Sequence, residues 1–206
     1  VFANSAALSN IISRVTGDNL SRLDGRIQAS GNANVFLINP NGIVIGPAAQ
    51  LEIGGSFFAS AGEGLRFDDG FVYSARSPTL PPLLSMSAPI GLALGDMPGR
   101  VEAITPTLSV AEGQTLALSG GDVSLRGAQL TAAGGRIEID SLGNISLLEQ
   151  SILDTTGPGG GAIDLQGQRV RLAGQSALIS DTLGGVNGNG IRVNAVDFSS
   201  EAGSFV

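Results

Sequence analysis

The second half of the chain repeats a short pattern in which two aliphatic residues flank one polar residue. From Leu116 onward, three series of aliphatic positions recur at similar distances. The steps are 22 and 25 residues in the first series, 26 and 28 in the second, and 22 and 26 in the third. The members are Val123/Leu125, Ile145/Leu147 and Val170/Leu172; Ile137/Ile139, Ile163/Leu165 and Ile191/Val193; and Leu130, Ile152 and Leu178. Three interleaved series with one approximate period predict three short strands in each turn of a coil.

Strands this short cannot bury an apolar face by themselves, so the coils must stack and align equivalent side chains in interior columns. Glycine-rich corners separate the strands: Gly120–Gly121, Gly134–Gly135, Pro158–Gly161, Gly184–Gly185 and Gly188–Gly190. A β-sandwich also has short alternating strands, but it does not require three registers with a shared period. The pattern predicts an all-β fold, a single-stranded parallel β-helix (β-solenoid) of about seven or eight coils.

The polar residues between the aliphatic positions are expected to face solvent, because successive side chains of a strand point to opposite faces. The clearest examples are Ser124, Glu138, Asp164, Arg171 and Arg192.

The first half of the chain is less regular but still contains strand-like segments at solenoid spacing. These are Ile27, 35–38, 43–45, Leu51/Ile53, Phe57/Phe58 and Leu65/Phe67. Ser77–Met86 does not fit, because its three prolines cannot donate ladder hydrogen bonds. We expect this segment to form a small excursion from the coil, as an edge hairpin, and a boundary to the cleaner repeats near 100–106.

Composition excludes several kinds of chemistry. The chain has no histidine and no cysteine, and all eleven of its basic residues are arginine. Catalytic triads, thiol nucleophiles, imidazole or thiolate metal sites and lysine-based chemistry are therefore absent. The net charge is −7 and no basic run occurs, which argues against nucleic acid as a partner.

The ends of the chain indicate a piece of a longer protein. The sequence begins at Val1 inside patterned sequence and shows no leader peptide, although one could precede it. No run approaches the ~18 apolar residues that span a bilayer, so we expect no membrane span.

Asn39-Pro40-Asn41-Gly42-Ile43 is the sharpest local motif. Proline fixes φ at the second position of a turn, asparagine tolerates the third and glycine favours the fourth. Because aliphatic runs flank it, the motif predicts a tight corner between two buried strands. The residues alone are explained by a structural turn.

Several segments together resemble a known family. They are N-V-F-L-I-N-P-N-G-I (34–43), G-P (46–47), G-G-S-F-F-A-S (54–60), S-N-I-I-S-R-V-T-G (9–17), L-D-G-R-I-Q-A-S-G (23–31), P-P-L-L-S-M-S-A-P-I-G-L (81–92) and G-G-D-V-S-L (120–125). They are similar to the haemagglutination-activity domain, the N-terminal secretion domain of filamentous-haemagglutinin-like exoproteins in two-partner secretion, and most of all to its cyanobacterial branch.

This resemblance implies a right-handed parallel β-helix and recognition in the periplasm by an outer-membrane β-barrel transporter. It implies a partner-recognition role for Asn39, Pro40, Asn41, Gly42 and Ile43. It also implies a secretion domain over residues 1–104, here without the family's N-terminal cap, followed by β-helix repeats over 105–206 that continue the same solenoid.

Acidic pairs are the remaining candidates for chemistry. Glu138/Asp140 and Asp154/Asp164 could face one another across coils, and solenoid lyases and glycosidases use such carboxylates. Those enzymes usually add a basic residue and a sugar-stacking aromatic, and aromatics make up only 4% of this chain. Asp68-Asp69 precedes Gly70 in a predicted turn, where aspartate is common. A solvated outer face explains these carboxylates without catalysis.

Gly157–Asp164 is similar to a glycine-rich calcium repeat, but its register is wrong and it does not recur. We therefore predict no metal and no cofactor.

Three functions follow from these patterns. The first is a secreted, non-enzymatic exoprotein whose N-terminal part is read by the transporter and whose β-helix forms an adhesive or structural stalk, with a host or neighbouring-cell surface as a possible target. The second is a polysaccharide-acting lyase or glycosidase, which requires a groove with convergent carboxylates and aromatics. The third is the passenger of a self-transporting exoprotein, which requires a C-terminal barrel. We expect the first, located outside the cell or at its surface.

Overall fold

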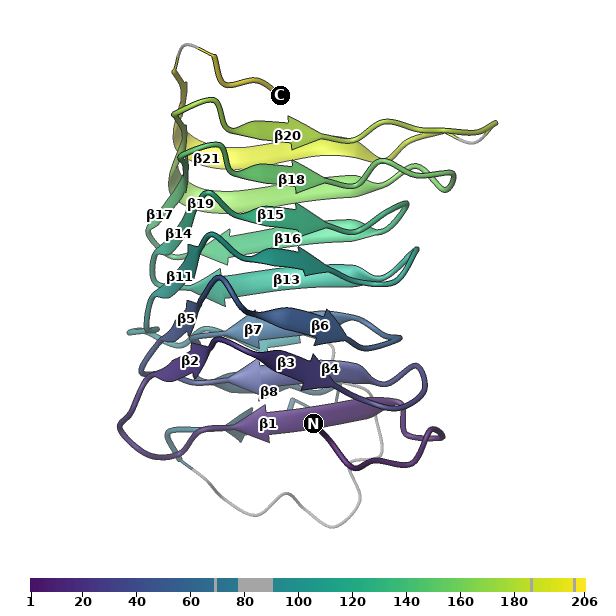
Figure 1. Ribbon diagram of the computed structural model, residues 1–206. Coiled ribbons are helices and arrows are strands. Elements are labelled where there is room, and N and C mark those ends of the chain that lie inside the picture. The colour runs from purple at the N-terminus through teal and green to yellow at the C-terminus, as the bar shows by residue number, and fades with distance from the viewer. Residues whose placement is uncertain (69, 78–90, 186, 202) are drawn as a thin grey trace.

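The strands stack into a right-handed parallel β-solenoid with the two termini at opposite ends (Figure 1). The computed structural model describes residues 1–68, 70–77, 91–185, 187–201 and 203–206. Seven coils are present, and every named element among these residues is a strand. The described part of the chain accordingly contains no helix able to cross a membrane. The predicted fold class is confirmed.

Each coil has three sides, and parallel strands stack along each of them. The first side holds β1 (Asn10–Arg14), β4 (Asn34–Ile38), β7 (Phe57–Ser60), β13 (Thr115–Gly120), β16 (Arg136–Ser141) and the first halves of β19 (Ala162–Leu172) and β21 (Gly190–Ser200). The second side holds β2 (Ser21–Leu23), β5 (Ile43–Ile45), β11 (Val101–Ile104), β14 (Val123–Arg126), β17 (Asn144–Leu148) and the second halves of β19 and β21. The third side holds β3 (Arg26–Gln28), β6 (Gln50–Glu52), β12 (Thr107–Ser109), β15 (Gln129–Thr131), β18 (Ile152–Asp154) and β20 (Ala177–Ile179).

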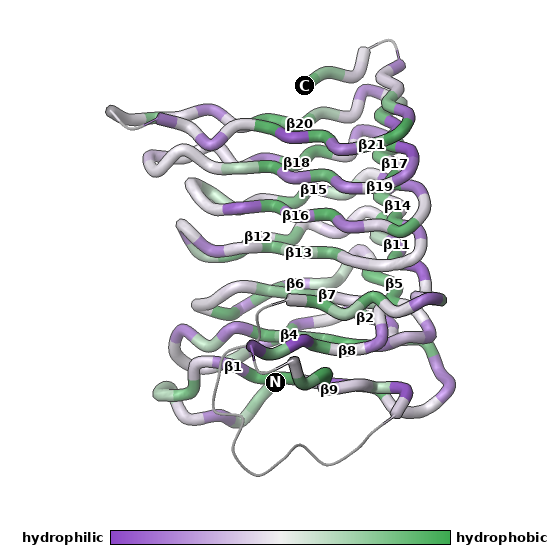
Figure 2. The backbone as a smooth tube through the Cα atoms, turned by 180° about the vertical axis from the view of Figure 1, so that it is seen from behind, coloured by the Kyte–Doolittle hydropathy of each residue, from purple (hydrophilic) through white to green (hydrophobic). Residues whose placement is uncertain are grey.

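The interior columns follow the predicted registers on two sides. On the first side, Ile137 is paired with Ile163, which is paired with Ile191. On the second side, Val123/Leu125, Ile145/Leu147 and Val170/Leu172 align in the same way. These side chains are buried in one continuous core, against which Ile191 packs partly buried. Figure 2 shows the resulting alternation of hydrophobic and hydrophilic positions along the later first-side strands, most clearly on β16.

The predicted third column is wrong by one residue. Leu130 is paired with Leu153, and Leu153 with Leu178, whereas Ile152 is paired with Gln129. The corner before β18 is one residue longer than the corner before β15, and both Glu149 and Gln150 take a positive φ there. The extra corner residue moves Ile152 out of the column and Leu153 into it.

An antiparallel sheet of three strands lies outside the coil. Its order is β10 (Gly91–Ala93), β8 (Gly64–Arg66) and β9 (Val72–Ser74). The chain leaves the coil after Ala61 and rejoins it at Gly99, whose N–H donates to the Ala61 carbonyl at 2.8 Å. The prediction of Leu65/Phe67 as a coil strand is therefore wrong. Of the predicted excursion over Ser77–Met86, residues 78–86 lie outside the described residues.

This excursion sheet covers the outer face of the first coils. Phe36 and Ile38 point outward from β4 and are buried against Leu65 and Phe67 in a second, smaller core. The rings of Phe36 and Phe58 stack with centroids 4.5 Å apart. The outer face of the first side is thus apolar in the early coils and polar from β16 onward. There, Glu138, Asp164 and Arg192 are half-buried or exposed, as predicted.

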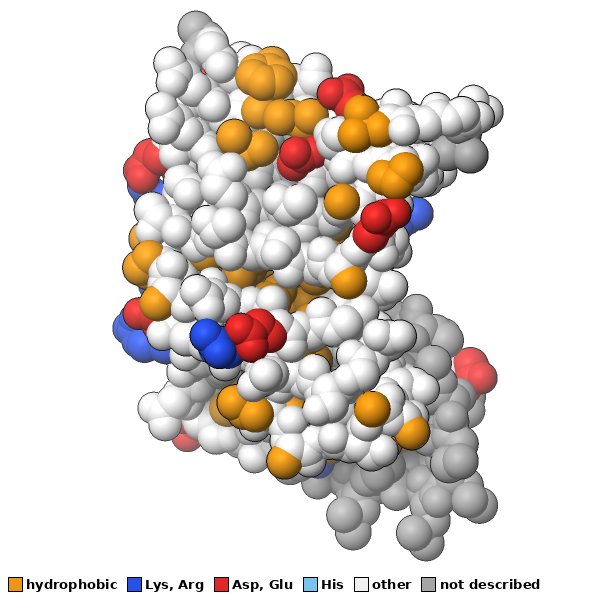
Figure 3. All heavy atoms as spheres, turned by 45° about the vertical axis from the view of Figure 1, so that its right-hand side comes forward, with side chains coloured by type: hydrophobic (Ala, Val, Ile, Leu, Met, Phe, Trp, Pro, Cys, Tyr) orange, Lys and Arg blue, Asp and Glu red, His pale blue; other side chains and the backbone are white. Residues whose placement is uncertain are grey.

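The solenoid is continuous through the predicted boundary near residue 104. β11 pairs with β5 on one flank and with β14 on the other. At the C-terminal end the last coil leaves apolar side chains at the surface (Figure 3), including Leu183, Phe205 and Val206. The division of the chain into 1–104 and 105–206 stays a prediction.

Candidate functional site

The Asn39–Ile43 motif forms the tight corner between β4 and β5, as predicted. The Gly42 N–H donates to the Asn39 carbonyl at 3.0 Å and closes the turn. Gly42 has φ of 120°, and a Cβ at that position would lie 3.1 Å from the Arg100 carbonyl oxygen. Ile43 is fully buried in the core. The sequence folds this way because proline and glycine each supply a backbone angle that the turn requires.

Asn39 is completely buried, and its amide is fully used. Its Nδ2 donates to the Asn19 carbonyl and to Ser21 Oγ, both at 2.9 Å. Its Oδ1 accepts hydrogen bonds from the backbone N–H and the Nδ2 of Asn41, both at 3.0 Å. Two donors and two acceptor positions are the whole capacity of an asparagine side chain. Asn39 therefore ties the corner of the second coil to the first coil.

Asn41 is the exposed member of the motif, since Pro40, Gly42 and Ile43 are also buried. Asn41 Nδ2 donates to the Gly17 carbonyl at 2.5 Å. Beside it lies a shallow polar pocket of about 170 Å³, lined by Val15, Thr16, Gly17, Asp18, Pro40, Asn41, Ala75 and Arg76. A partner that binds this corner would contact Asn41 and the pocket walls. The sequence did not predict that Arg76 lines this pocket. The excursion places Arg76 beside Asn41, and no local sequence motif indicates that placement.

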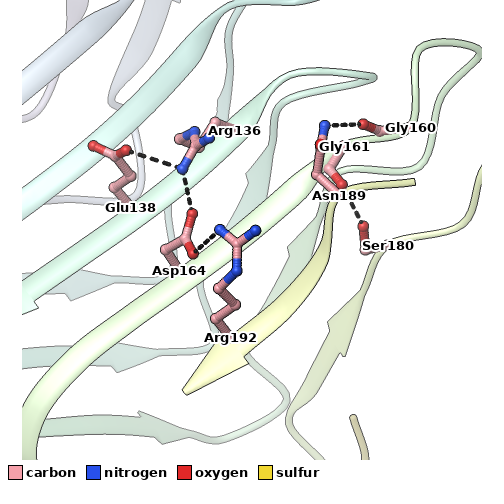
Figure 4. A network of polar contacts seen from close by, with 8 residues as sticks. All are labelled: Arg136, Glu138, Gly160, Gly161, Asp164, Ser180, Asn189 and Arg192. Atoms are coloured by element: carbon pink, nitrogen blue, oxygen red, sulfur yellow. Dashed lines mark hydrogen bonds and ion pairs between the residues drawn. The ribbon is translucent and has the colours of Figure 1, made fainter. Parts of the chain in front are cut away.

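Three of the four candidate carboxylates share the outer face of the first side, and Figure 4 shows two of them, Glu138 and Asp164. Glu138 and Asp140 lie on β16, and Asp164 is the register partner of Glu138 on β19. Arg136 Nη1 lies 2.5 Å from Asp164 Oδ2 and 3.5 Å from Glu138 Oε1. Arg192 Nη1 lies 3.2 Å from Asp164 Oδ1. Asp164 is thus held between two guanidinium groups.

The other acidic candidates do not join this group. The expectation that Asp154 faces Asp164 is wrong, because Asp154 lies on β18 of the third side, where its Oδ1 accepts from the Thr156 N–H at 2.8 Å. Asp68 occupies the predicted turn, where the Gly70 N–H donates to the Phe67 carbonyl at 3.0 Å, and Asp69 lies outside the described residues. In the described ranges, no group of three or more acidic side chains is placed to hold a metal ion.

Burial raises the pKa of both carboxyl groups on β16. For Glu138, desolvation raises the pKa, the Arg136 guanidinium partly opposes this, and the charges of Asp140 and Asp164 add to the rise. For Asp140, desolvation raises the pKa and the charge of Asp164 raises it further. In the folded chain, both groups therefore hold a proton more tightly than an exposed carboxyl group does.

We expect Asp140→Asn to raise the melting temperature at pH 7 by roughly 1–3 °C. Because the folded-state pKa of Asp140 lies above its unfolded value, the group favours folding below the unfolded pKa. That contribution is lost as the pH rises through the folded pKa. The advantage of the variant should therefore shrink as the pH falls towards 3.8, the ordinary value for aspartate. Calorimetry from pH 7 to pH 3.5 measures it.

Asp181→Asn is the matched control for this experiment. Asp181 is exposed and its carboxylate has no hydrogen bond or ion pair with the described residues. The same loss of charge should leave the melting temperature unchanged there. A lower melting temperature for Asp140→Asn at pH 7 would show that the Asp140 carboxylate stabilises the fold.

The solenoid, its excursion sheet and the corner held by Asn39 define a right-handed β-helical domain. Residues 1–193 match the family model described as "TPS secretion domain", so the chain belongs to this family of two-partner secretion domains. The resemblance to a two-partner secretion domain, noted in the sequence, is thereby confirmed. Domains of this family occur in exoproteins exported by two-partner secretion, and the family implies an outer-membrane transporter as the partner.

One curated relative shares a short segment with this chain. The "Heme/hemopexin-binding protein" of Haemophilus influenzae is 42% identical over 55 residues, which are 27% of this chain and 5% of that protein. The matched segment thus spans a small part of the relative's length. No solved structure matches the chain.

Proposed function

We propose that this chain is the part of a secreted exoprotein that an outer-membrane two-partner transporter recognises during export. The carrying observation is the match of residues 1–193 to the TPS secretion domain. The protein then passes through the periplasm and the outer membrane and acts outside the cell or at its surface.

The corner at Asn39–Ile43 contributes to that recognition. The pocket beside Asn41 supports this assignment, because an amide residue, an acidic residue and a basic residue (Asn41, Asp18 and Arg76) line one small area. Asn39, Pro40, Gly42 and Ile43 act from beneath by fixing the shape of that surface. Asn41 and the pocket walls make the contact.

The coils serve as a structural or adhesive stalk that presents the protein to a host or neighbouring-cell surface. Seven coils spaced by about 4.8 Å give a rod roughly 30–35 Å long, and further coils can extend such a rod without a new fold. In this proposal residues 1–104 carry the secretion function and residues 105–206 begin the stalk.

The protein acts without catalysis. Carbohydrate-active solenoids usually place an aromatic face for a sugar ring beside their carboxylates, and here the two phenylalanines that share a groove with Glu138 and Asp140 stack one face of each ring on the other. Asp164 is neutralised by Arg136 and Arg192 rather than left free to act on a substrate. Both observations favour binding over polysaccharide cleavage.

The proposal is tested by secretion from cells with and without the partner transporter. The chain, directed to the periplasm by a leader peptide, should reach the medium only when its two-partner transporter is present. In its absence the chain should remain in the periplasm. Equal amounts in the medium from both strains would refute recognition by the transporter.

A further inference from the structure

We propose that the groove between the excursion sheet and the middle coils binds the guanidinium group of an arginine carried by a partner polypeptide. The groove has a volume of about 550 Å³ and lies over β13 and β16 on the first side. One wall comes from Leu92 and Leu94 on or beside β10, and another from the Phe36–Phe58 pair. Its polar end is formed by Ser119, Glu138 and Asp140. It is separate from the Asn41 pocket.

The polar end holds a carboxylate that no described residue neutralises. Asp140 is half-buried, and its side chain has neither a hydrogen bond nor an ion pair within the described part of the chain. The same face carries two positive charges, on Arg136 and Arg192, and three carboxyl groups, those of Glu138, Asp140 and Asp164. Both arginines contact Asp164, and Arg136 also contacts Glu138. One negative charge is therefore left over, at the Asp140 end.

A second observation at the same place also indicates a ligand. Ser119 is the register partner of Asp140 on the neighbouring strand, and its side chain points outward, since Leu118 beside it is part of the core. Ser119 is only 1% exposed, yet its Oγ has no hydrogen-bond partner in the described structure. A buried hydroxyl without a partner costs free energy that a donor from a ligand would recover.

A guanidinium group matches this end of the groove. It carries one positive charge and five N–H donors in a planar fork, so it can contact a carboxylate through two hydrogen bonds and a hydroxyl through a third. Its aliphatic stem and an apolar neighbour in the partner chain would lie along Leu92, Leu94 and Phe58. The unpaired Asp140 carboxylate, the Ser119 hydroxyl without a hydrogen-bond partner and the apolar walls together favour one ligand: a single guanidinium group flanked by apolar side chains of the partner polypeptide.

The binding test uses the full chain and short peptides at low salt, followed by NMR of the backbone amides. Acetyl-Leu-Arg-Leu-amide should bind and shift amides of β10, β13 and β16. The neutral isostere with citrulline in place of arginine should bind at least tenfold more weakly. Acetyl-arginine-amide, which lacks the leucines, should bind at least fivefold more weakly than the tripeptide.

Variants locate the site. Asp140→Asn should weaken the arginine tripeptide at least tenfold and Ser119→Ala about threefold, whereas Asp181→Asn should change its Kd less than twofold. Equal binding of the arginine and citrulline peptides, or shifts confined to other strands, would overturn the proposal whether or not the variants fold. If Asp140→Asn and Asp181→Asn weakened binding of the arginine tripeptide equally, the binding would be nonspecific charge attraction and the proposed site would be wrong. Equal affinity of the tripeptide and acetyl-arginine-amide would overturn the assignment to a polypeptide.

Discussion

Ile163→Asp is expected to destabilise the chain by more than about 4 kcal/mol. Ile163 is completely buried and lies between Ile137 and Ile191 in the interior column of the first side. A carboxylate there would be surrounded by aliphatic side chains with no cation within reach, and the methyl groups that fill the column would be lost. Because each coil is stabilised by its neighbours, the damage should spread to the coils on both sides. Urea titration followed by circular dichroism measures the loss.

Arg171→Ser is the control on the same strand. Arg171 points outward and forms an ion pair with Glu201, and both side chains are about half exposed. An exposed pair of this kind contributes little, so the variant should lose less than about 0.5 kcal/mol. Similar losses for the two variants would mean that the inward and outward positions of β19 are reversed.

The sequence pattern was sufficient for the repeating half because the coils there are nearly equal in length. Equivalent residues then recur at similar steps, and two of the three predicted columns are correct. The third failed at the corner of Glu149 and Gln150, where one added residue changes which side chain points inward. An isoleucine followed by a leucine gives no local sign of which one is buried.

The excursion sheet could not be predicted from periodicity. Its strand β8 alternates in the same way as a coil strand, because parallel and antiparallel strands share a period of two. What distinguishes it is its packing over Phe36 and Ile38, which lie more than twenty residues away in the sequence. The groove and the Arg76 side of the corner pocket depend on this long-range packing, so they could not be predicted from the sequence either.

The corner itself was predictable as a turn, since proline and glycine determine it locally. The burial of Asn39 was not, because its partners Asn19 and Ser21 belong to the preceding coil. The stacking that gives the solenoid its core also converts this asparagine from a turn residue into a link between coils.

Asn39→Ala is expected to reduce the amount of the full-length parent protein outside the cell at least fivefold, while the purified variant stays folded. The substitution leaves the Asn19 carbonyl, Ser21 Oγ and the Asn41 N–H without their partner, which should cost about 1–3 kcal/mol. A solenoid of seven coils should survive that loss, but the exposed Asn41 side chain would lose a hydrogen bond that positions it. The protein in the medium and in the periplasm is measured by immunoblot, and the melting temperature of the purified variant by calorimetry.

Ser151→Ala separates recognition from stability, because it removes buried hydrogen bonds of similar value far from the corner. Ser151 is completely buried; its Oγ donates to the Leu148 carbonyl at 2.7 Å and accepts from the Ala128 N–H at 3.2 Å. If the transporter reads the corner, Ser151→Ala should lower the melting temperature to a similar extent as Asn39→Ala and still be secreted normally. Asn41→Ala should lose secretion with a smaller change in melting temperature, since Asn41 is exposed. Secretion that falls in proportion to melting temperature across all three variants would leave Asn39–Ile43 as a structural turn alone.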